Sequence, residues 1–132
     1  MTSRWQAEKS AVAGTARVMS QMGLVTGTSG NVSVRFSPSE TGEPLMAVTP
    51  AATAYSTMQA DDIVVTDFEV DPIDSDLTPS SESLMHVAIY RARPDVGAVI
   101  HTHSVYSSVL AVSGLDIPPV LDEVIVNIGG AI

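Results

Sequence analysis

An apolar run rich in β-branched residues ends in two histidines that are separated by one threonine. The run covers residues 98–100 and leads into His101-Thr102-His103. Such a run predicts a buried β-strand, and residues i and i+2 of a strand point to the same face. Two imidazoles that project side by side can hold a divalent transition metal such as zinc. The alternative is a pair of hydrogen-bonded, inert histidines at the end of a core strand.

Composition limits the class of protein. The chain has 132 residues, 45% of them hydrophobic, with a net charge of −9 and no cysteine. We expect one domain over residues 1–132, and the apolar ending 127–132 predicts that its C-terminal part is missing from the chain. The acidic charge argues against nucleic acid or a membrane as partner. Without a run near the roughly 18 apolar residues that span a bilayer, and without a signal-peptide core, we expect a cytoplasmic enzyme.

Hydrophobic spacing predicts interleaved helices and short strands, and hence an α/β or α+β domain. A first helix is expected over residues 4–22, where Ser3 and Gln6 have capping-box spacing. A second helix opens at residues 79–82 and stops before Pro94, and a third covers residues 106–113. Strands are expected over residues 32–36, 45–48, 63–65 and 124–128, with a loop over residues 67–78. The second helix is expected to turn four apolar side chains inward, namely Leu84, Met85, Ala88 and Ile89.

The glycine-rich loop Gly27-Thr28-Ser29-Gly30-Asn31 can aim successive backbone N–H groups at an anion. It follows a helix and precedes a strand, which is the reverse of the order in nucleotide-binding loops. It also lacks the lysine and the full glycine pattern of those loops, so nucleotide binding is rejected. The alternative is an ordinary turn.

The segment Thr78-Pro79-Ser80-Ser81-Glu82 has two interpretations. All its residues suit a helix start, and its hydroxyls and N–H groups could also surround an anion. Glu82 beside a metal can shuttle protons. His86 lies four residues on and shares a helix face with Glu82. A histidine on this helix is more often a satisfied structural residue than a metal ligand.

Three stretches in series resemble the class II aldolase/adducin family. This family includes the zinc-dependent fuculose-phosphate and rhamnulose-phosphate aldolases and ribulose-phosphate 4-epimerase. Their order in the chain matches the family, and the likeness covers nearly the whole sequence. The stretches are Gly23-Leu24-Val25-Thr26-Gly27-Thr28-Ser29-Gly30-Asn31-Val32-Ser33, Pro79-Ser80-Ser81-Glu82 and Arg93-Pro94-Asp95-Val96-Gly97-Ala98-Val99-Ile100-His101-Thr102-His103.

The resemblance implies a three-layer α/β/α fold with a mainly antiparallel central sheet, and a homo-oligomer, typically a tetramer. It also implies a role for each matching residue. His101 and His103 would be two of three zinc-binding histidines, and Glu82 would be the catalytic acid/base. The phosphate of a sugar phosphate would be held by Gly27, Thr28, Asn31, Ser80 and Ser81. His86 matches no ligand of the family.

Two departures from the family pattern stand out. The third histidine of the family would lie beyond Ile132. The segment that usually reads Thr-Pro-Ser/Thr-Gly is Thr49-Pro50-Ala51-Ala52 here, which points to a divergent phosphate pocket and substrate.

The leading hypothesis is a zinc-dependent aldolase that cleaves a ketose 1-phosphate to dihydroxyacetone phosphate and an aldehyde. The metal would act as a Lewis acid. A 4-epimerase of the same family is the nearest alternative, although epimerases tend to carry Asp at the position of Glu82. A lyase for methylthioribulose or deoxyribulose phosphates and a non-catalytic adducin-like scaffold are the others.

Overall fold

The computed structural model of the protein describes residues 4–38 and 42–132. The helices are α1 (Gln6–Gln21), α2 (Ser83–Ala92), α3 (Val105–Val112) and α4 (Asp122–Asn127), and the strands are β1 (Asn31–Phe36), β2 (Leu45–Val48), β3 (Val64–Thr66) and β4 (Ala98–His101). Short 3₁₀ turns occupy Tyr55–Thr57 and Ala60–Asp62. The chain divides into two compact units between Thr102 and His103.

The first unit is built on an antiparallel sheet of four strands in the order β3-β2-β1-β4. Asn31 of β1 lies opposite His101 of β4, and Ser33 lies opposite both Val99 of β4 and Val48 of β2. The strands expected over residues 32–36, 45–48 and 63–65 are confirmed to within a residue. The long connection over residues 67–78 contains no strand or helix of its own, as expected.

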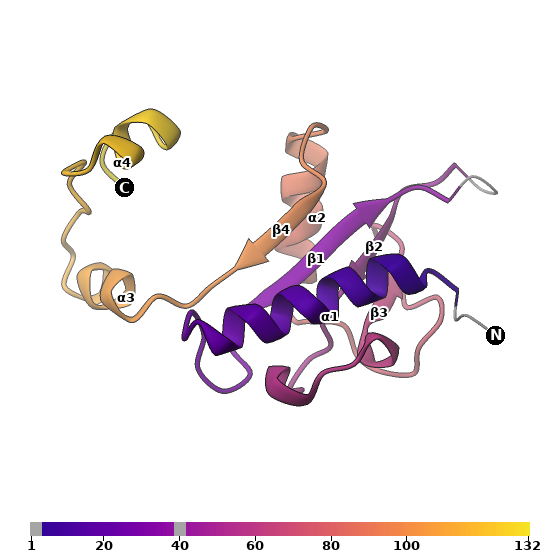
Figure 1. Cartoon of the computed structure of the whole chain (residues 1–132). Coiled ribbons are helices and arrows are strands. Elements are labelled where there is room, and N and C mark those ends of the chain that lie inside the picture. The colour runs from indigo at the N-terminus through magenta and orange to yellow at the C-terminus, as the bar shows by residue number, and fades with distance from the viewer. Residues whose placement is uncertain (1–3, 39–41) are drawn as a thin grey trace. The chain divides into compact units, whose positions relative to one another are not determined.

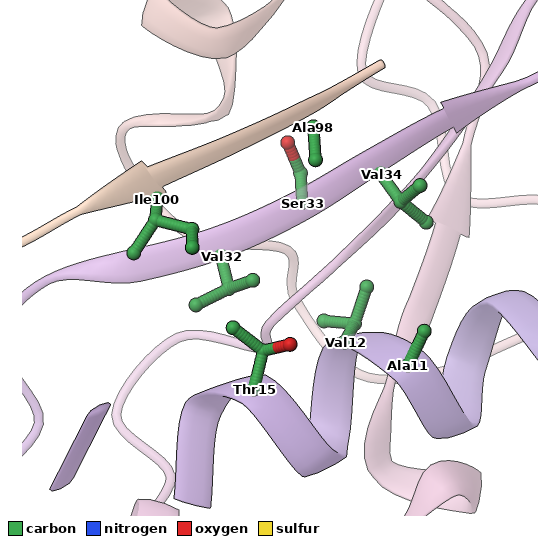
Figure 2. A pocket seen from close by; sticks show the side chains of 8 residues that line it. All are labelled: Ala11, Val12, Thr15, Val32, Ser33, Val34, Ala98 and Ile100. Atoms are coloured by element: carbon green, nitrogen blue, oxygen red, sulfur yellow. The ribbon is translucent and has the colours of Figure 1, made fainter. Parts of the chain in front are cut away.

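Each face of the sheet is covered by one helix, which gives the three layers that the resemblance implies (Figure 1). Because side chains alternate along a strand, Val32 and Val34 point toward α1 while Ser33 points away from it (Figure 2). The core beneath α1 contains Val12, Ala16, Val32, Ala47, Ile63 and Val65 among its buried residues. The core beneath α2 is formed by Met46, Val48, Val64, Val87 and Tyr90.

Helix α1 begins later than expected. Trp5 precedes it with a left-handed φ of 58° and packs against Phe36, with ring centroids 5.9 Å apart. Val12, Ala16 and Met19 of α1 are buried against the sheet. The capping-box role predicted for Ser3 lies outside the described residues.

The inward face predicted for α2 is wrong. Leu84 and Met85 are exposed by 65% and 38%, and the buried residues of the helix are Ser83, His86, Val87 and Tyr90. Apolar spacing predicted that the face with Leu84 and Met85 is buried, because that face carries more aliphatic side chains than the opposite one. The helix is rotated because His86 and Tyr90 find hydrogen-bond partners beneath it, which removes the cost of burying polar groups.

Strand β4 is not the buried strand that its composition predicts. It is an edge strand with β1 as its partner, and Ile100 is 55% exposed. It also ends at His101, so His103 lies beyond the strand rather than on its face.

The second unit, residues 103–132, has α3 close to the expected range, and Gly114 follows it with φ 67°. The strand predicted over residues 124–128 is wrong, because this region forms α4. Asp122 and Glu123 lie in the first turn of α4, where carboxylates favour a helix. Among residues 4–38 and 42–132, no helix has both the length and the apolarity needed to cross a membrane.

Candidate metal centre and active site

Three elements of the first unit bring polar side chains to one end of the sheet. Asn31 is the first residue of β1 and is paired with His101, the last residue of β4. Glu82 directly precedes α2. The antiparallel pairing of β1 with β4 places the start of one strand beside the end of the other, so residues about 70 positions apart in the sequence become neighbours here.

Glu82 lies at the centre of this arrangement. Its Oε2 atom is 2.9 Å from Nδ1 of His101 and 2.6 Å from the Asn31 Nδ2 group, which donates to it. Asn31 Nδ2 also donates to Ser80 Oγ over 2.9 Å. Glu82 and His101 keep partly exposed side chains, so a small molecule can reach them. Asn31 itself is buried.

The start of α2 is fastened to the loop after β2. The N–H group of Ser80 donates to the carbonyl of Thr49 over 3.0 Å, and the N–H group of Ala51 donates to the carbonyl of Thr78 over 2.9 Å. Ser83 Oγ donates to the carbonyl of Ser80. These bonds hold Ser80 and Glu82 against the sheet.

Ala52 occupies the place where the family pattern has glycine. Its φ is 54°, in the left-handed region that glycine adopts without strain. The chain therefore adopts a conformation that favours glycine while carrying a side chain there. Ala52 is exposed.

Gly30 explains how the glycine-rich loop approaches the site. Its φ is 75°, and a Cβ at this position would lie 2.6 Å from the carbonyl oxygen of His101 and 2.6 Å from Cγ1 of Val25. No side chain fits there without moving the backbone of the strand end that carries His101. Only glycine permits this close approach.

The other residues of the predicted phosphate pocket are more exposed. Gly27, with φ 62°, and Thr28 lie in an exposed turn that Ser29 closes, since Ser29 N–H and Ser29 Oγ both donate to the carbonyl of Thr26. Ser81 is exposed, and Ser80 is buried. The structure therefore groups Asn31 and Ser80 with Glu82 and leaves Gly27, Thr28 and Ser81 open to solvent.

His86 is a satisfied structural residue rather than a ligand, which confirms the interpretation preferred from the sequence. It is fully buried, and its two ring nitrogens contact Asn31 Oδ1 at 2.5 Å and Ser33 Oγ at 2.6 Å. Burial and the nearby charge of His101 lower the pKa of His86 from 6.5 to about 4, against the opposing effect of Glu82. The ring is therefore neutral near pH 7.

Sequence reasoning missed Gly30 as a site residue, and it missed Ser33 and Tyr90, which join the buried network around His86. A signal for the network was present, because Glu82, His86 and Tyr90 recur at intervals of four along one helix face. A groove between α1 and the β1–β4 pair (Figure 2) has no ionisable side chain in its lining of Ala11, Val12, Thr15, Val32, Ser33, Val34, Ala98 and Ile100.

The donor set suits a divalent transition metal. In the first unit, Glu82 and His101 bring a carboxylate oxygen and an imidazole nitrogen within 2.9 Å of each other. Imidazole and carboxylate are ligands for zinc and its neighbours in the first transition series. His103 is exposed and is the first residue of the second unit.

Comparisons with known proteins agree on the family. Residues 10–132 match the family described as Class II Aldolase and Adducin N-terminal domain. A 5-methylthioribulose-1-phosphate/5-deoxyribulose-1-phosphate aldolase from Escherichia coli O45:K1 (strain S88 / ExPEC) is 46% identical over 106 residues, which cover 80% of this chain and 46% of that protein.

Solved structures show the same fold. An L-fuculose 1-phosphate aldolase is 33% identical with a TM-score of 0.74, over 90% of this chain and 53% of that one. The l-fuculose-1-phosphate aldolase from Thermus Thermophilus has a TM-score of 0.68 at 23% identity, over 93% of this chain and 59% of that one. The chain thus spans about half the length of these relatives. The match over residues 10–132, together with the shared fold, shows that this chain belongs to the class II aldolase and adducin N-terminal domain family.

Proposed function

We propose that the protein is a metal-dependent aldolase that cleaves a ketose 1-phosphate to dihydroxyacetone phosphate and an aldehyde. The observation that carries this proposal is the Glu82–His101 pair, with Oε2 and Nδ1 2.9 Å apart at an accessible end of the sheet. The 46% identity to a 5-methylthioribulose-1-phosphate/5-deoxyribulose-1-phosphate aldolase makes these two 5-substituted ribulose phosphates the first substrates to test.

By the family pattern, His101 and His103 would hold the metal, with zinc as the first candidate, and His101 lies 2.9 Å from Glu82. A bound divalent ion supplies Lewis-acid stabilisation of the negative charge that develops on the substrate oxygens as the C–C bond breaks. In the retro-aldol step, the C4 hydroxyl gives its proton to solvent water, the C3–C4 bond breaks and C4 becomes the carbonyl carbon of the aldehyde. Its bonding electrons pass to the fragment that contains C1 to C3.

Glu82 would deliver the proton that C3 needs to complete dihydroxyacetone phosphate. Asn31 holds the Glu82 carboxylate through a 2.6 Å hydrogen bond, which keeps Glu82 in one place relative to His101. A fixed acid/base lowers the entropic cost of reaching the reactive geometry.

The substrate phosphate would bind to Gly27, Thr28, Asn31, Ser80 and Ser81. The exposed turn at Gly27 and Thr28 and the exposed Ser81 support this assignment, because these residues are accessible and residues of these types can offer hydroxyl and backbone N–H groups to an anion. The Asn31 amide and the Ser80 hydroxyl are already bonded to each other, so these two residues would hold the rim of the pocket in place.

The same family contains two alternatives, but neither is favoured. The curated relative and the 33% identical structure are both named as aldolases. A non-catalytic scaffold role does not require a carboxylate and an imidazole held together at an accessible site. Product analysis also separates an aldolase from an epimerase, because an epimerase returns one isomeric sugar phosphate.

The test is to incubate the intact, zinc-loaded protein with 5-methylthioribulose 1-phosphate, 5-deoxyribulose 1-phosphate and L-fuculose 1-phosphate. Dihydroxyacetone phosphate is detected by its reduction with NADH and glycerol-3-phosphate dehydrogenase, and the aldehyde by NMR. Cleavage of at least one substrate, lost in Glu82→Gln, is the expected result. An isomeric sugar phosphate, or no product from any of the three, would contradict the proposal.

We also propose a cytoplasmic homo-oligomer, with a tetramer expected from the family. The exposed Leu84 and Met85 on α2 support a surface that a second copy covers, since such side chains are usually buried. Light scattering on the intact protein tests this, and replacing both residues by glutamate should lower the measured mass.

A further inference from the structure

A chain of hydrogen bonds runs from Glu82 into the core beneath α2. Glu82 accepts from Asn31 Nδ2, and Asn31 Oδ1 lies 2.5 Å from Nε2 of His86. The other ring nitrogen, Nδ1, lies 2.6 Å from Ser33 Oγ, which is 2.7 Å from the hydroxyl of Tyr90. Asn31, Ser33, His86 and Tyr90 are all buried.

The direction of each bond in this chain is fixed by chemistry. A carboxylate only accepts, so the NH₂ group of Asn31 must face Glu82 and its carbonyl oxygen must face His86. A carbonyl oxygen also only accepts, so His86 carries its proton on Nε2. The neutral ring then leaves Nδ1 bare to accept from Ser33, and Ser33 Oγ in turn accepts from the Tyr90 hydroxyl.

We propose that His86 is a positioning residue for Glu82, acting through the Asn31 amide. The Nε2–H group of His86 holds the Asn31 oxygen, so that both N–H groups of the amide point to Glu82 and Ser80. Without this donor, the amide loses one of the contacts that distinguish its two orientations, and its buried oxygen is left without that partner. The flipped orientation sets the Asn31 oxygen against the Glu82 carboxylate, and the two repel each other.

The burial of His86 supports this role. Water cannot replace the Nε2–H donor, because the side chain is fully buried. His86 therefore supplies a contact to the Asn31 oxygen that solvent cannot replace.

The catalytic consequence rests on the proposed aldolase function, whereas the orientation of the network does not. Two variants of the intact, zinc-loaded protein test the catalytic consequence. His86→Leu removes both ring contacts, and His86→Gln retains an N–H donor that can reach Asn31. Val87→Ala is the matched control, since Val87 is the next residue of α2, is equally buried and packs in the apolar cluster.

For His86→Leu we expect a ten- to hundredfold lower kcat, the size typical for residues that orient a catalytic group. KM and the zinc content per subunit should change little, and His86→Gln should recover most of the loss. Val87→Ala should lower stability with wild-type kcat. Wild-type kcat in a folded His86→Leu protein, or equal losses in Leu and Gln variants, would overturn the proposal.

A second measurement does not depend on activity. The ¹⁵N spectrum of histidine-labelled protein reports which ring nitrogen of each histidine is protonated, and His86→Gln identifies the His86 signals. We expect the Nε2–H form at pH 7. In uniformly labelled protein, the Asn31 side-chain N–H groups should exchange slowly in wild type and His86→Gln and rapidly in His86→Leu. The Nδ1–H form would overturn the proposal even if the wild type cleaves no ketose 1-phosphate or His86→Leu fails to fold.

Discussion

The two faces of the sheet are built from the same strands and differ in chemistry. Toward α1, Val32, Ala47 and Val65 pack with α1 side chains in an apolar core. Toward α2, Asn31 and Ser33 of β1 meet His86 and Tyr90 in a hydrogen-bonded network that ends at Glu82. The apolar face stabilises the fold by burial. The polar face has an apolar cluster as well, and its hydrogen bonds hold the catalytic candidate Glu82 in position.

The largest effect is expected where the polar face reaches solvent. Glu82→Gln should lower kcat by a factor of about 10² to 10⁴, the range for loss of a general acid/base. Zinc content should stay the same, because His101 and His103 remain. The assay is steady-state cleavage of a ketose 1-phosphate. Glu69→Gln is the control, since Glu69 is an exposed carboxylate paired with Arg91, and near-normal kcat in Glu82→Gln would contradict the assignment.

Substitutions beneath each of the two helices should lower the free energy of unfolding, for different physical reasons. Ile63→Ala on the α1 face is expected to cost about 3 kcal/mol of unfolding free energy through lost burial and a cavity. Ser33→Ala on the α2 face removes one oxygen, and it should still cost about 2 kcal/mol because His86 and Tyr90 lose a buried partner. Urea unfolding measures both. Equal stability of wild type and Ser33→Ala would show that the polar network is not formed.

Acid should lower the free energy of unfolding through His86 on the polar face. His86 is neutral in the folded protein, because burial and the charge of His101 lower its pKa from 6.5 to about 4. In the unfolded chain the His86 ring takes up a proton at a higher pH than in the folded protein. The contribution of His86 to the free energy of unfolding is therefore fully present above pH 6.5 and is lost as the pH falls toward 4. Between pH 7 and pH 5 the loss is about 2 kcal/mol.

Urea unfolding of wild type and His86→Gln at pH 7 and pH 5 measures this loss. The variant has no imidazole at position 86 and should lose correspondingly less stability. The same pH dependence in both proteins would assign the acid sensitivity to another group.

The smallest effect is expected at the loop after β2. Ala52→Gly should raise the unfolding free energy by about 1 kcal/mol, since alanine is strained at a φ of 54° and glycine is not. The gain is partly offset by the greater freedom of glycine in the unfolded chain. Thermal unfolding measures it, with Ala54→Gly, whose φ is −69°, as the control that should lose stability.

Much of the fold could be predicted because its signals are local. Alternation in residues 32–36 and the β-branched residues of β2 and β3 gave strand positions within a residue. The predictions failed where context decides. The β-branched residues of α4 favour a strand by propensity. No strand within residues 4–38 and 42–132 pairs with them, and the acidic first turn favours the helix.

The site was predictable in part for the same reason. Glu82 and His101 each lie in a recognisable local stretch, and the structure brings them together. The link from Asn31 to His86 joins residues 55 positions apart, and it depends on how α2 is rotated over β1. Apolar spacing predicted a different rotation for this helix, so the network could not be found from spacing alone.

The most direct test of this account is the metal content of the intact protein, measured by elemental analysis beside His101→Ala, His103→Ala and Glu82→Gln. We expect about one zinc-like ion per subunit in wild type and Glu82→Gln, and none in either histidine variant. Retention of the metal in His101→Ala, or no metal in wild type after incubation with zinc, cobalt or manganese, would contradict a metal centre at this end of the sheet.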